Sequence, residues 1–291
     1  MGVRGLTKFF LERAPAAFQQ INLSMFRHEK IAFDGANILY AARRNGDDHI
    51  ASLGTFFRRL VSEYDVHPVV VFDGSFPTWK RRETQLDRSH QEHELARLRR
   101  LHLRYSADTE RTPCDRITLR IKQLLDRQIR LTPTDFTDTI DVLRELKIPY
   151  LYAAQEAETL CFDLWQEGKV AAVVSDDSDL LVLGVGRLIV QVCQRTLDAT
   201  CITVSTALAA LAITPEQLVN MALLFGTDCN ARVFPKHTPW HMLRLVQTVP
   251  LDQIVTCPKQ HLELLKLREK FLRVDREPFT MRIPYSGVPR A

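Results

Sequence analysis

No stretch of this sequence is apolar for long enough to cross a membrane, because a spanning helix needs roughly 18 consecutive apolar residues. Charged residues also interrupt the first ten positions, which argues against a signal-peptide core there. Glycine is scarce, at 11 of 291 residues, and proline is no more frequent than average, at 14, which together exclude collagen-like and low-complexity chains. We therefore expect a folded protein that is neither inserted in a membrane nor secreted.

Closely paired cysteines are also absent. The six cysteines are widely spaced and form no CxxC pair. This pattern argues against a disulfide framework and against a zinc ribbon, because both need cysteines at close, repeated spacings. We expect reduced thiols in an intracellular protein.

Basic residues are unevenly distributed along the chain. The whole sequence has 39 lysines and arginines against 35 acidic residues. The segment Lys80–Arg130 holds 14 of the basic residues and 8 of the acidic ones, so it carries a net charge of +6. Such clustering favours a polyanionic partner such as nucleic acid, although a solvated helical face explains the charge alone equally well.

Short apolar runs that end in acidic residues predict the sheet. The runs at 31–33, 69–72 and 171–174 are typical of buried strands, and an acidic residue follows each within two positions. Helical patterns such as 133–146 separate these runs, so we expect an α/β fold with a parallel sheet. In such a sheet the carboxyl ends of the strands meet at one crevice, where the acidic residues would converge.

Further helices are indicated by periodicity and by start and stop signals. The charged segment predicts two helices, near 95–104 and 117–125, as an insertion between strands. The run Thr214-Pro215-Glu216-Gln217 is a capping box that begins another helix, which we expect to end at Gly226. Two more helices are predicted near 240–246 and 261–272.

The most informative feature is a set of acidic residues at predicted strand and helix ends. Several carboxylates held together cannot all stay ionised unless cations compensate them. Oxygen-only ligands favour Mg²⁺ or Mn²⁺, and two such ions suit in-line hydrolysis of phosphodiesters. The seven residues are Asp34, Asp73, Glu156, Glu158, Asp177, Asp179 and Asp228.

Each acidic residue also has an ordinary explanation when it is taken alone. An aspartate after a strand is usually a turn or capping residue. Glu156 and Glu158 could merely complement the N-terminus of a helix. The run Asp176-Asp177-Ser178-Asp179 is harder to explain in this way, because its three like charges repel unless something binds them.

The order and context of these residues resemble a known family. The start reads MGVRGLTKFF, and the later blocks read FDGANILY, VVVFDGSFPTWK, IPYLYAAQEAE, VVSDDSDLLVLG and ALLFGTDC. Over about 1–229 the chain resembles the flap endonuclease/XPG family of structure-specific 5′ nucleases, within the wider PIN-like nucleases. The resemblance implies a divalent-metal-dependent nuclease that hydrolyses flapped or branched DNA in replication or repair.

The resemblance also implies a domain plan and a metal site. The nuclease core would span 1–229, with a PIN-like, mostly parallel sheet flanked by helices and a basic helical arch at 78–130. Residues 230–291 would form a degenerate helix-hairpin-helix-like region and C-terminal helices. In the family the seven acidic positions hold two Mg²⁺ ions, for which Mn²⁺ substitutes. Asp34, Asp177 and Lys80 are the residues that the resemblance makes catalytic.

Nucleic-acid contacts follow from the same resemblance. Gly2 would place the N-terminus near the active site, Tyr40 would stack on a base at the cleavage site, and Lys80 at the arch base would neutralise the scissile phosphate. The full expected set is Gly2, Tyr40, Lys80, Arg81, Arg82, Arg88, Arg97, Arg100, Arg104 and Lys236.

The sequence departs from the family pattern after its last acidic residue. The family has a glycine-flanked hairpin that grips duplex backbone, whereas Asn230–His237 is shorter and has no glycine. An RNA endonuclease resembling herpesvirus host-shutoff nucleases is therefore an alternative, and an inactive nucleic-acid-binding scaffold is a third.

No sliding-clamp motif is evident. The resemblance further implies a monomer and is compatible with a nuclear location, and the compact length would also suit a protein of viral origin.

Overall fold

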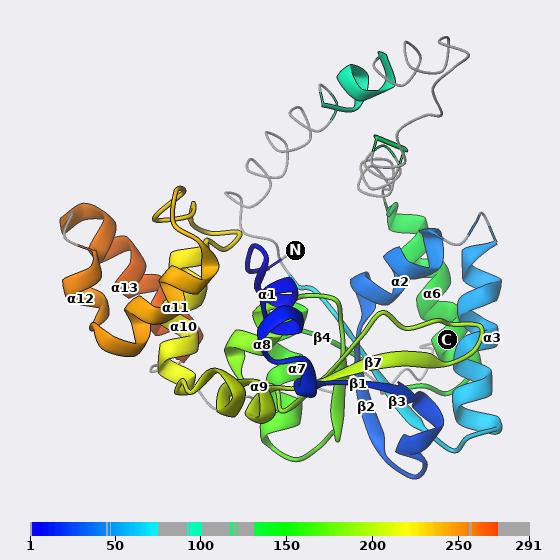
Figure 1. Ribbon diagram of the computed structural model, residues 1–291. Coiled ribbons are helices and arrows are strands. Elements are labelled where there is room, and N and C mark those ends of the chain that lie inside the picture. Colours follow the sequence, from blue (N-terminus) through cyan, green and yellow to red (C-terminus); the bar gives the residue numbers. More distant parts are fainter. Residues whose placement is uncertain are drawn as a thin grey trace, which may run out of the picture.

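In the described part of the chain, one seven-stranded sheet forms the centre (Figure 1). The computed structural model describes residues 2–44, 46, 48–74, 92, 94–100, 117–118, 121, 131–255 and 258–272. The strands are β1 (Phe18–Asn22), β2 (Lys30–Asp34), β3 (His67–Phe72), β4 (Tyr150–Tyr152), β5 (Ala172–Val174), β6 (Arg187–Val190) and β7 (Asp198–Thr203). Their order across the sheet is β1-β7-β6-β5-β2-β3-β4.

Five neighbouring strands are parallel, as the alternation of strands and helices predicts. β4, β3, β2, β5 and β6 pair in parallel, and the three strands expected from the apolar runs are β2, β3 and β5. β7 then runs antiparallel to both β6 and β1, which completes a mixed sheet. The sequence did not predict this antiparallel edge, because β1 and β6 have only weak alternation of apolar and polar residues.

Alternating side chains on the central strands fill two cores. Phe33 on β2 faces one core and packs edge-on against Phe57, with 5.5 Å between ring centroids, whereas Ala32 faces the other core. Figure 1 shows α2, α3 and α6 on one face of the sheet and α1, α7 and α8 on the other. Because both faces are covered, the central strands are apolar throughout, as buried parallel strands are.

The helices begin and end at the signals that the sequence carries. Thr132 and Thr214 each accept a backbone N–H bond in a capping box, at the starts of α6 and α10. Gly226 ends α10 as expected, with a φ of 90°. The α-helices are α1 (Leu6–Arg13), α2 (Gly35–Arg44), α3 (His49–Ser62), α6 (Pro133–Glu145), α7 (Ala157–Gln166), α8 (Asp179–Leu183), α9 (Val204–Leu211), α10 (Pro215–Phe225), α11 (Pro239–Thr248), α12 (Leu251–Ile254) and α13 (Pro258–Leu272).

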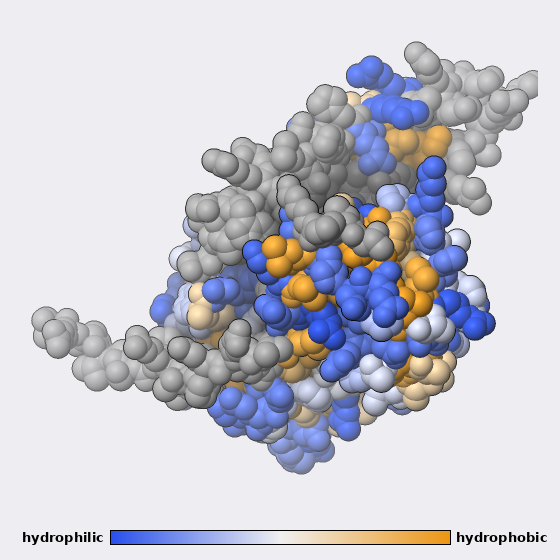
Figure 2. Space-filling model, turned by 90° about the vertical axis from the view of Figure 1, so that its left-hand side faces the viewer, coloured by the Kyte–Doolittle hydropathy of each residue, from blue (hydrophilic) through white to orange (hydrophobic). Residues whose placement is uncertain are grey.

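The helices from α10 to α13 pack together beside the sheet (Figure 1). Figure 2 views the molecule from the side of these helices, where apolar areas lie among a mostly hydrophilic surface. Leu262 on α13 is 56% exposed. Among the described residues no single helix is long and apolar enough to cross a bilayer. Only α9 and α10 together, bent by 84°, meet that length and composition.

Most of the expected arch lies outside the described residues. Within it, 94–100 is helical, as the leucine stripe predicts. Leu95 is buried there, whereas Arg97 and Arg100 are exposed, so the charged stripe of this helix faces solvent. Lys80, Arg81, Arg82, Arg88 and Arg104 all fall outside the described part of the chain.

Candidate active site

The acidic residues gather where the parallel strands end. Asp34 is the last residue of β2, Asp73 directly follows β3, and Asp177 lies three residues beyond β5. Because these three strands are neighbours and run in the same direction, their carboxyl ends lie at one edge of the sheet. The sequence predicted this edge as the site, and the topology confirms that the three strand ends meet there.

Asp34 lies at the centre of this edge and is 7% exposed. Its Oδ1 accepts the backbone N–H of Asn37 at 3.1 Å, and its Oδ2 accepts the hydroxyl of Ser175 at 3.0 Å. Burial raises the pKa of Asp34 to about 7, and the charges of Asp73 and Asp177 add to this effect. Asp73 and Asp177 are therefore each close enough to Asp34 to disfavour its ionised form.

Ser175 connects two of the acidic residues. Its hydroxyl donates to Asp34 and accepts the backbone N–H of Asp177 at 3.1 Å. Asp177 Oδ1 in turn accepts the backbone N–H of Asp179 at 3.0 Å, at the start of α8. Ser175 is 1% exposed, so this connection is shielded from water. The sequence reasoning missed Ser175, because a serine after a strand carries no ligand signal of its own.

The start of α7 brings two more acidic residues to the same edge. Asp73 Oδ1 accepts the backbone N–H of Ala157 at 2.7 Å, so an aspartate from β3 binds the first turn of α7. Glu156 occupies the capping position without a side-chain cap bond, and Glu158 lies in the first turn. Burial raises the pKa of Cys161, one turn further on, and the nearby charges of Asp34, Glu158 and Asp73 raise it further.

The N-terminal segment closes the site from the other side. The Gly2 N–H donates to Asp228 Oδ2 at 3.2 Å, just beyond the end of α10. Gly2 has a φ of +86°, and a Cβ built on it would lie 2.3 Å from Asp177 Oδ1. The backbone of Gly2 thus lies between Asp228 and Asp177, in contact with the first and against the second. The structure therefore places Gly2 at the acidic edge, where the family resemblance located it.

The chemistry of these donors fits divalent ions of the magnesium type. All seven acidic side chains offer oxygen, and Asp34, Glu156 and Asp177 are buried, where an unbalanced negative charge is unfavourable. A bound cation would relieve the repulsion that raises the pKa of Asp34. In the described part of the chain, no three acidic, histidine or cysteine side chains already stand in the close arrangement of a metal site.

The residues expected to contact nucleic acid are placed only in part. Tyr40 lies on α2 and is partly exposed, and Arg97 and Arg100 are exposed on the helical piece 94–100. Lys236 is exposed in the loop between α10 and α11. These positions allow nucleic-acid contacts and do not test them.

The loop at 226–238 has its own internal order despite lacking the family's glycine-flanked hairpin. Asn230 accepts the hydroxyl proton of Thr227 at 2.8 Å, and the Arg232 guanidinium donates to the carbonyl of His237 at 2.5 Å. The carbonyl of Gly226 accepts the Arg4 N–H at 2.9 Å. The loop joins two packed helices, α10 and α11, and side-chain hydrogen bonds hold its turns beyond Gly226. That residues 230–291 form a degenerate helix-hairpin-helix-like region stays a prediction.

An arginine–tryptophan stack lies beside this loop and was not predicted. Trp240 on α11 is 42% exposed, and the guanidinium carbons of Arg13 and Arg244 lie 4.8 Å and 5.1 Å from the centroid of its ring. Arg13 comes from α1, about 230 positions away in sequence, so no local pattern could have revealed the group. Its two exposed cations and an aromatic face suit contact with a nucleic-acid strand.

Two family profiles match the chain at the segments that build this edge. The XPG N-terminal domain matches residues 1–94, and the XPG I-region matches residues 147–228. The chain belongs to the XPG/flap endonuclease family. The matched segments include all seven acidic residues, and 95–146, with most of the arch, lies between them.

Curated relatives agree with this family. Flap endonuclease 1 of Mycosarcoma maydis is 29% identical over 245 residues, covering 78% of this chain and 63% of the relative. Flap endonuclease 1 of Mus musculus is 28% identical over 242 residues, covering 78% and 61%. The chain thus spans less than two thirds of the length of these two relatives.

The solved structures show the same fold at lower identity. The catalytic core of Rad2 in complex with DNA substrate aligns with a TM-score of 0.60 and 19% identity, over 94% of this chain and 80% of that one. Human GEN1 in complex with Holliday junction DNA aligns with a TM-score of 0.62 and 19% identity, over 98% and 69%. Flap endonuclease-1 from Methanococcus jannaschii gives 0.59 and 21%, over 87% and 81%. These alignments support the α/β, PIN-like fold.

Proposed function

We propose that this protein is a divalent-metal-dependent nuclease that cleaves flapped or branched DNA, in replication or repair. One observation carries the proposal: Asp34, Asp73 and Asp177, which are far apart in sequence, meet at the carboxyl edge of a parallel sheet, where the charges of Asp73 and Asp177 raise the pKa of the buried Asp34. A protein keeps such a costly arrangement where a cation binds. The names of the relatives, flap endonucleases above all, supply the substrate class.

The seven acidic residues are the proposed ligands of two Mg²⁺ ions, with Mn²⁺ as a substitute. When bound, such ions supply a water that is acidic enough to attack a phosphodiester and a positive charge beside the leaving oxygen. A structurally similar protein, the Holliday junction-resolving enzyme GEN1, is described in complex with product DNA and a Mg²⁺ ion, which supports this choice of metal.

The surrounding residues hold the acidic edge in place. Ser175 and Asn37 direct both oxygens of Asp34 with hydrogen bonds, so this buried side chain keeps one orientation. Asp73 is held by the first turn of α7, and Gly2 lets the N-terminal backbone approach Asp177 closely. Such support fixes a reactive geometry before substrate arrives. Lys80, outside the described residues, is proposed to neutralise the scissile phosphate.

The test compares two adjacent aspartates. Asp177 is buried in the site, whereas Asp176 is exposed and its Oδ1 accepts the backbone N–H of Gln191 at 2.9 Å. Asp177→Asn should lower the rate of cleavage of a 5′-labelled DNA flap by a factor of about 10³ or more while flap binding remains. Asp176→Asn removes the same charge one residue away and should leave the rate within a few fold of wild type.

A single-stranded RNA of the same sequence is tested in parallel with Mg²⁺. Cleavage of the DNA junction by wild type and by Asp176→Asn, lost in Asp177→Asn, would support the proposal. Cleavage of RNA alone would replace it with the RNA endonuclease reading. Binding of the flap without cleavage in Mg²⁺ or Mn²⁺ would identify a nucleic-acid-binding scaffold instead.

A further inference from the structure

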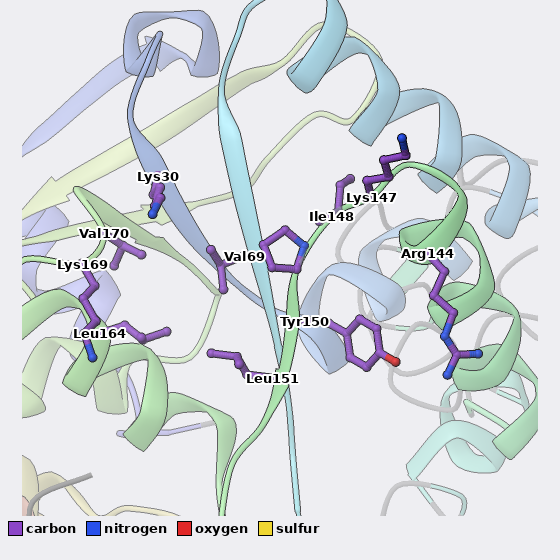
Figure 3. Close-up of a pocket in the computed structure, with 11 residues that line it drawn as sticks. Lys30, Val69, Arg144, Lys147, Ile148, Tyr150, Leu151, Leu164, Lys169 and Val170 are labelled. Atoms are coloured by element: carbon purple, nitrogen blue, oxygen red, sulfur yellow. The ribbon is translucent and has the colours of Figure 1, made fainter. Parts of the chain in front are cut away.

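A cavity lies at the edge of the sheet opposite the acidic residues, where β2, β3 and β4 begin (Figure 3). Its volume is about 610 Å³, within the range of pockets that hold small ligands or side chains. The floor is apolar and consists of Val69, Leu151, Leu164 and Val170, from β3, β4, α7 and the segment before β5. The acidic residues lie at the other ends of the same strands, so the two sites are separate.

The rim of this cavity is basic. Lys30, Arg144, Lys147 and Lys169 line it, and no acidic residue of the described ranges does. Figure 3 shows Lys30 and Lys169 at one end of the cavity and Arg144 at the other, beside Tyr150. All four basic residues are exposed at the surface. The cavity therefore combines an apolar floor with a positive rim.

Two of these basic side chains already have acidic neighbours outside the cavity. Lys169 lies 2.6 Å from Glu167, and Arg144 lies 3.0 Å from Asp141. Lys30 and Lys147 have no carboxylate within 4 Å in the described part of the chain. The uncompensated charge of the rim is thus contributed by these two lysines, which lie on different elements.

The neighbouring strand is open on its outer side. β4 is the last strand in the order of the sheet, and its inner groups pair with β3, as in the bond from the Val70 N–H to the carbonyl of Pro149 at 3.0 Å. Within the described residues no strand pairs with its outer edge. An extended peptide can hydrogen-bond to such an edge while placing alternate side chains into an adjacent pocket.

We propose that this cavity binds an acidic segment of a partner protein, with one or two apolar side chains on the floor and carboxylates against Lys30 and Lys147. The charge of the rim favours an acidic occupant and disfavours the segment 273–291 of this chain, which has four basic and two acidic residues. The apolar floor distinguishes the cavity from a phosphate site, which needs polar donors. A partner held here leaves the acidic edge open to substrate.

An array of short synthetic peptides tests the proposal directly. Every peptide has acidic residues flanking one or two apolar residues, and the set varies the apolar residue and its spacing from the acids. One control set replaces the apolar residues with serine, and another replaces the acids with lysine. The peptides that bind in the array are then titrated with the full chain, and binding is followed by fluorescence anisotropy. Protein concentrations up to about 1 mM detect dissociation constants up to that value, which corresponds to a binding free energy near −4 kcal/mol.

Two charge-reversal variants make the matched comparison. Lys30→Glu combined with Lys147→Glu should weaken peptide binding at least about tenfold, because both uncompensated charges of the rim are reversed. Lys8→Glu combined with Lys266→Glu makes the same change of charge at exposed residues of α1 and α13, and this control should leave the affinity for the peptide unchanged. Val69→Phe, which fills the floor, should also weaken binding. Flap cleavage by the rim variant should equal that of wild type.

Each remaining outcome overturns the proposal. No binding of any acidic–apolar peptide, or equal binding of the serine controls, would show that the floor is not used. Equal affinity of the rim variant and wild type would show that the lysines are not used. If anilinonaphthalene sulfonate binds the cavity and no peptide does, the site takes small organic anions only. Because cleavage is measured separately, a failure here differs from a failure of the proposed nuclease activity.

Discussion

At the scale of single residues, Gly2 is the position where the site tolerates least change. Gly2 and Gly5 both have left-handed φ angles, +86° and +76°, so a side chain strains the backbone equally at either position. Only Gly2 is crowded, because its Cβ would meet Asp177 Oδ1 at 2.3 Å, whereas nothing lies within 4 Å of a Cβ on Gly5. The difference between the two substitutions therefore isolates the effect on the site.

We expect Gly2→Ala to lower the flap cleavage rate by about 10² or more, because a displacement of about 1 Å at a reactive centre has that effect. Gly5→Ala should cost stability, by roughly 1 kcal/mol, and leave the rate per folded molecule near wild type. Single-turnover rates and urea unfolding of both variants supply the measurement. Equal rates for the two variants would show that the N-terminal segment does not shape the site.

Asp34 makes a second prediction at this scale. Because the pKa of Asp34 is raised in the native state, the two states differ between about pH 4 and pH 7. In this range the native state holds the Asp34 proton, whereas the unfolded state has lost it. The contribution of Asp34 to stability therefore falls as the pH rises through this window, and at pH 8 the buried charge destabilises the metal-free protein. The penalty is at most on the order of 4 kcal/mol.

Asp34→Asn removes that buried charge. In EDTA at pH 8 the variant should have a higher melting temperature than wild type, and at pH 4 the difference should disappear. Adding Mg²⁺ should raise the melting temperature of wild type more than that of the variant, because the variant has lost a ligand. A variant that is less stable than wild type in EDTA at pH 8 would contradict this reasoning.

At the scale of elements, two helices begin with capping boxes of different chemistry. α6 uses Thr132 and Asp135, whereas α10 uses Thr214 and Gln217. Burial acts to raise the pKa of Asp135, but bonds from the backbone and hydroxyl of Thr132 and the contact with His49 at 2.8 Å outweigh it and lower the pKa. Only the first box carries an ionisable group with a lowered pKa.

We expect Asp135→Asn to cost about 1 to 2 kcal/mol at pH 7, since it loses charge-assisted hydrogen bonds. A lowered pKa stabilises the native state above the unfolded pKa of about 4, and this stability is lost as the pH falls through the folded pKa. The cost should therefore shrink toward pH 3. Thr214→Ala should cost about 1 kcal/mol at every pH. Urea unfolding from pH 7 downwards measures both, and parallel curves would contradict the assignment.

The elements also show what the sequence can and cannot predict. β2, β3, β5, α6 and α10 were predicted because each has a local signal, either a continuous apolar run or a capping box. β4 and β5 have only three residues each, and the register of their pairing depends on contacts with distant segments. The antiparallel edge β6-β7-β1 joins the start of the chain to its middle, so no local pattern encodes it.

In the site, too, the residues with a local sequence signal could be predicted, and the contacts between distant segments could not. The acidic residues could be found because they follow strands or begin helices. Ser175, the contact of Asp73 with Ala157 and the stack on Trp240 could not, because each depends on a partner from another element. The basic-rimmed cavity is likewise formed by several separate elements.

At the scale of the whole molecule, we expect the stack of Arg13, Trp240 and Arg244 to extend the surface that binds DNA. Because Asp177→Asn leaves the substrate uncut, binding of flap DNA can be measured in that background. Adding Arg13→Gln or Arg244→Gln should each reduce the slope of log affinity against log salt by about 0.9, the value for one lost phosphate contact. Trp240→Ala should weaken binding by about 1 to 3 kcal/mol with little change in slope.

Arg58→Gln serves as the control for these variants, because Arg58 is exposed on α3 and pairs with Glu145 at 3.6 Å. Its salt slope should match that of the parent. If all three arginine variants lower the slope equally, the effect belongs to net charge and not to the stack.

The bond between Gly2 and Asp228 joins residues 226 positions apart. During synthesis the first residues leave the ribosome long before Asp228 does. The N-terminal segment therefore cannot form its bond with Asp228 until most of the chain has been made. Contacts of such long sequence separation form late in folding. A chain that terminates before the end of α10 has most of the sheet but cannot complete this edge. Prematurely terminated chains are therefore expected to fold in part and to be unable to cleave nucleic acid.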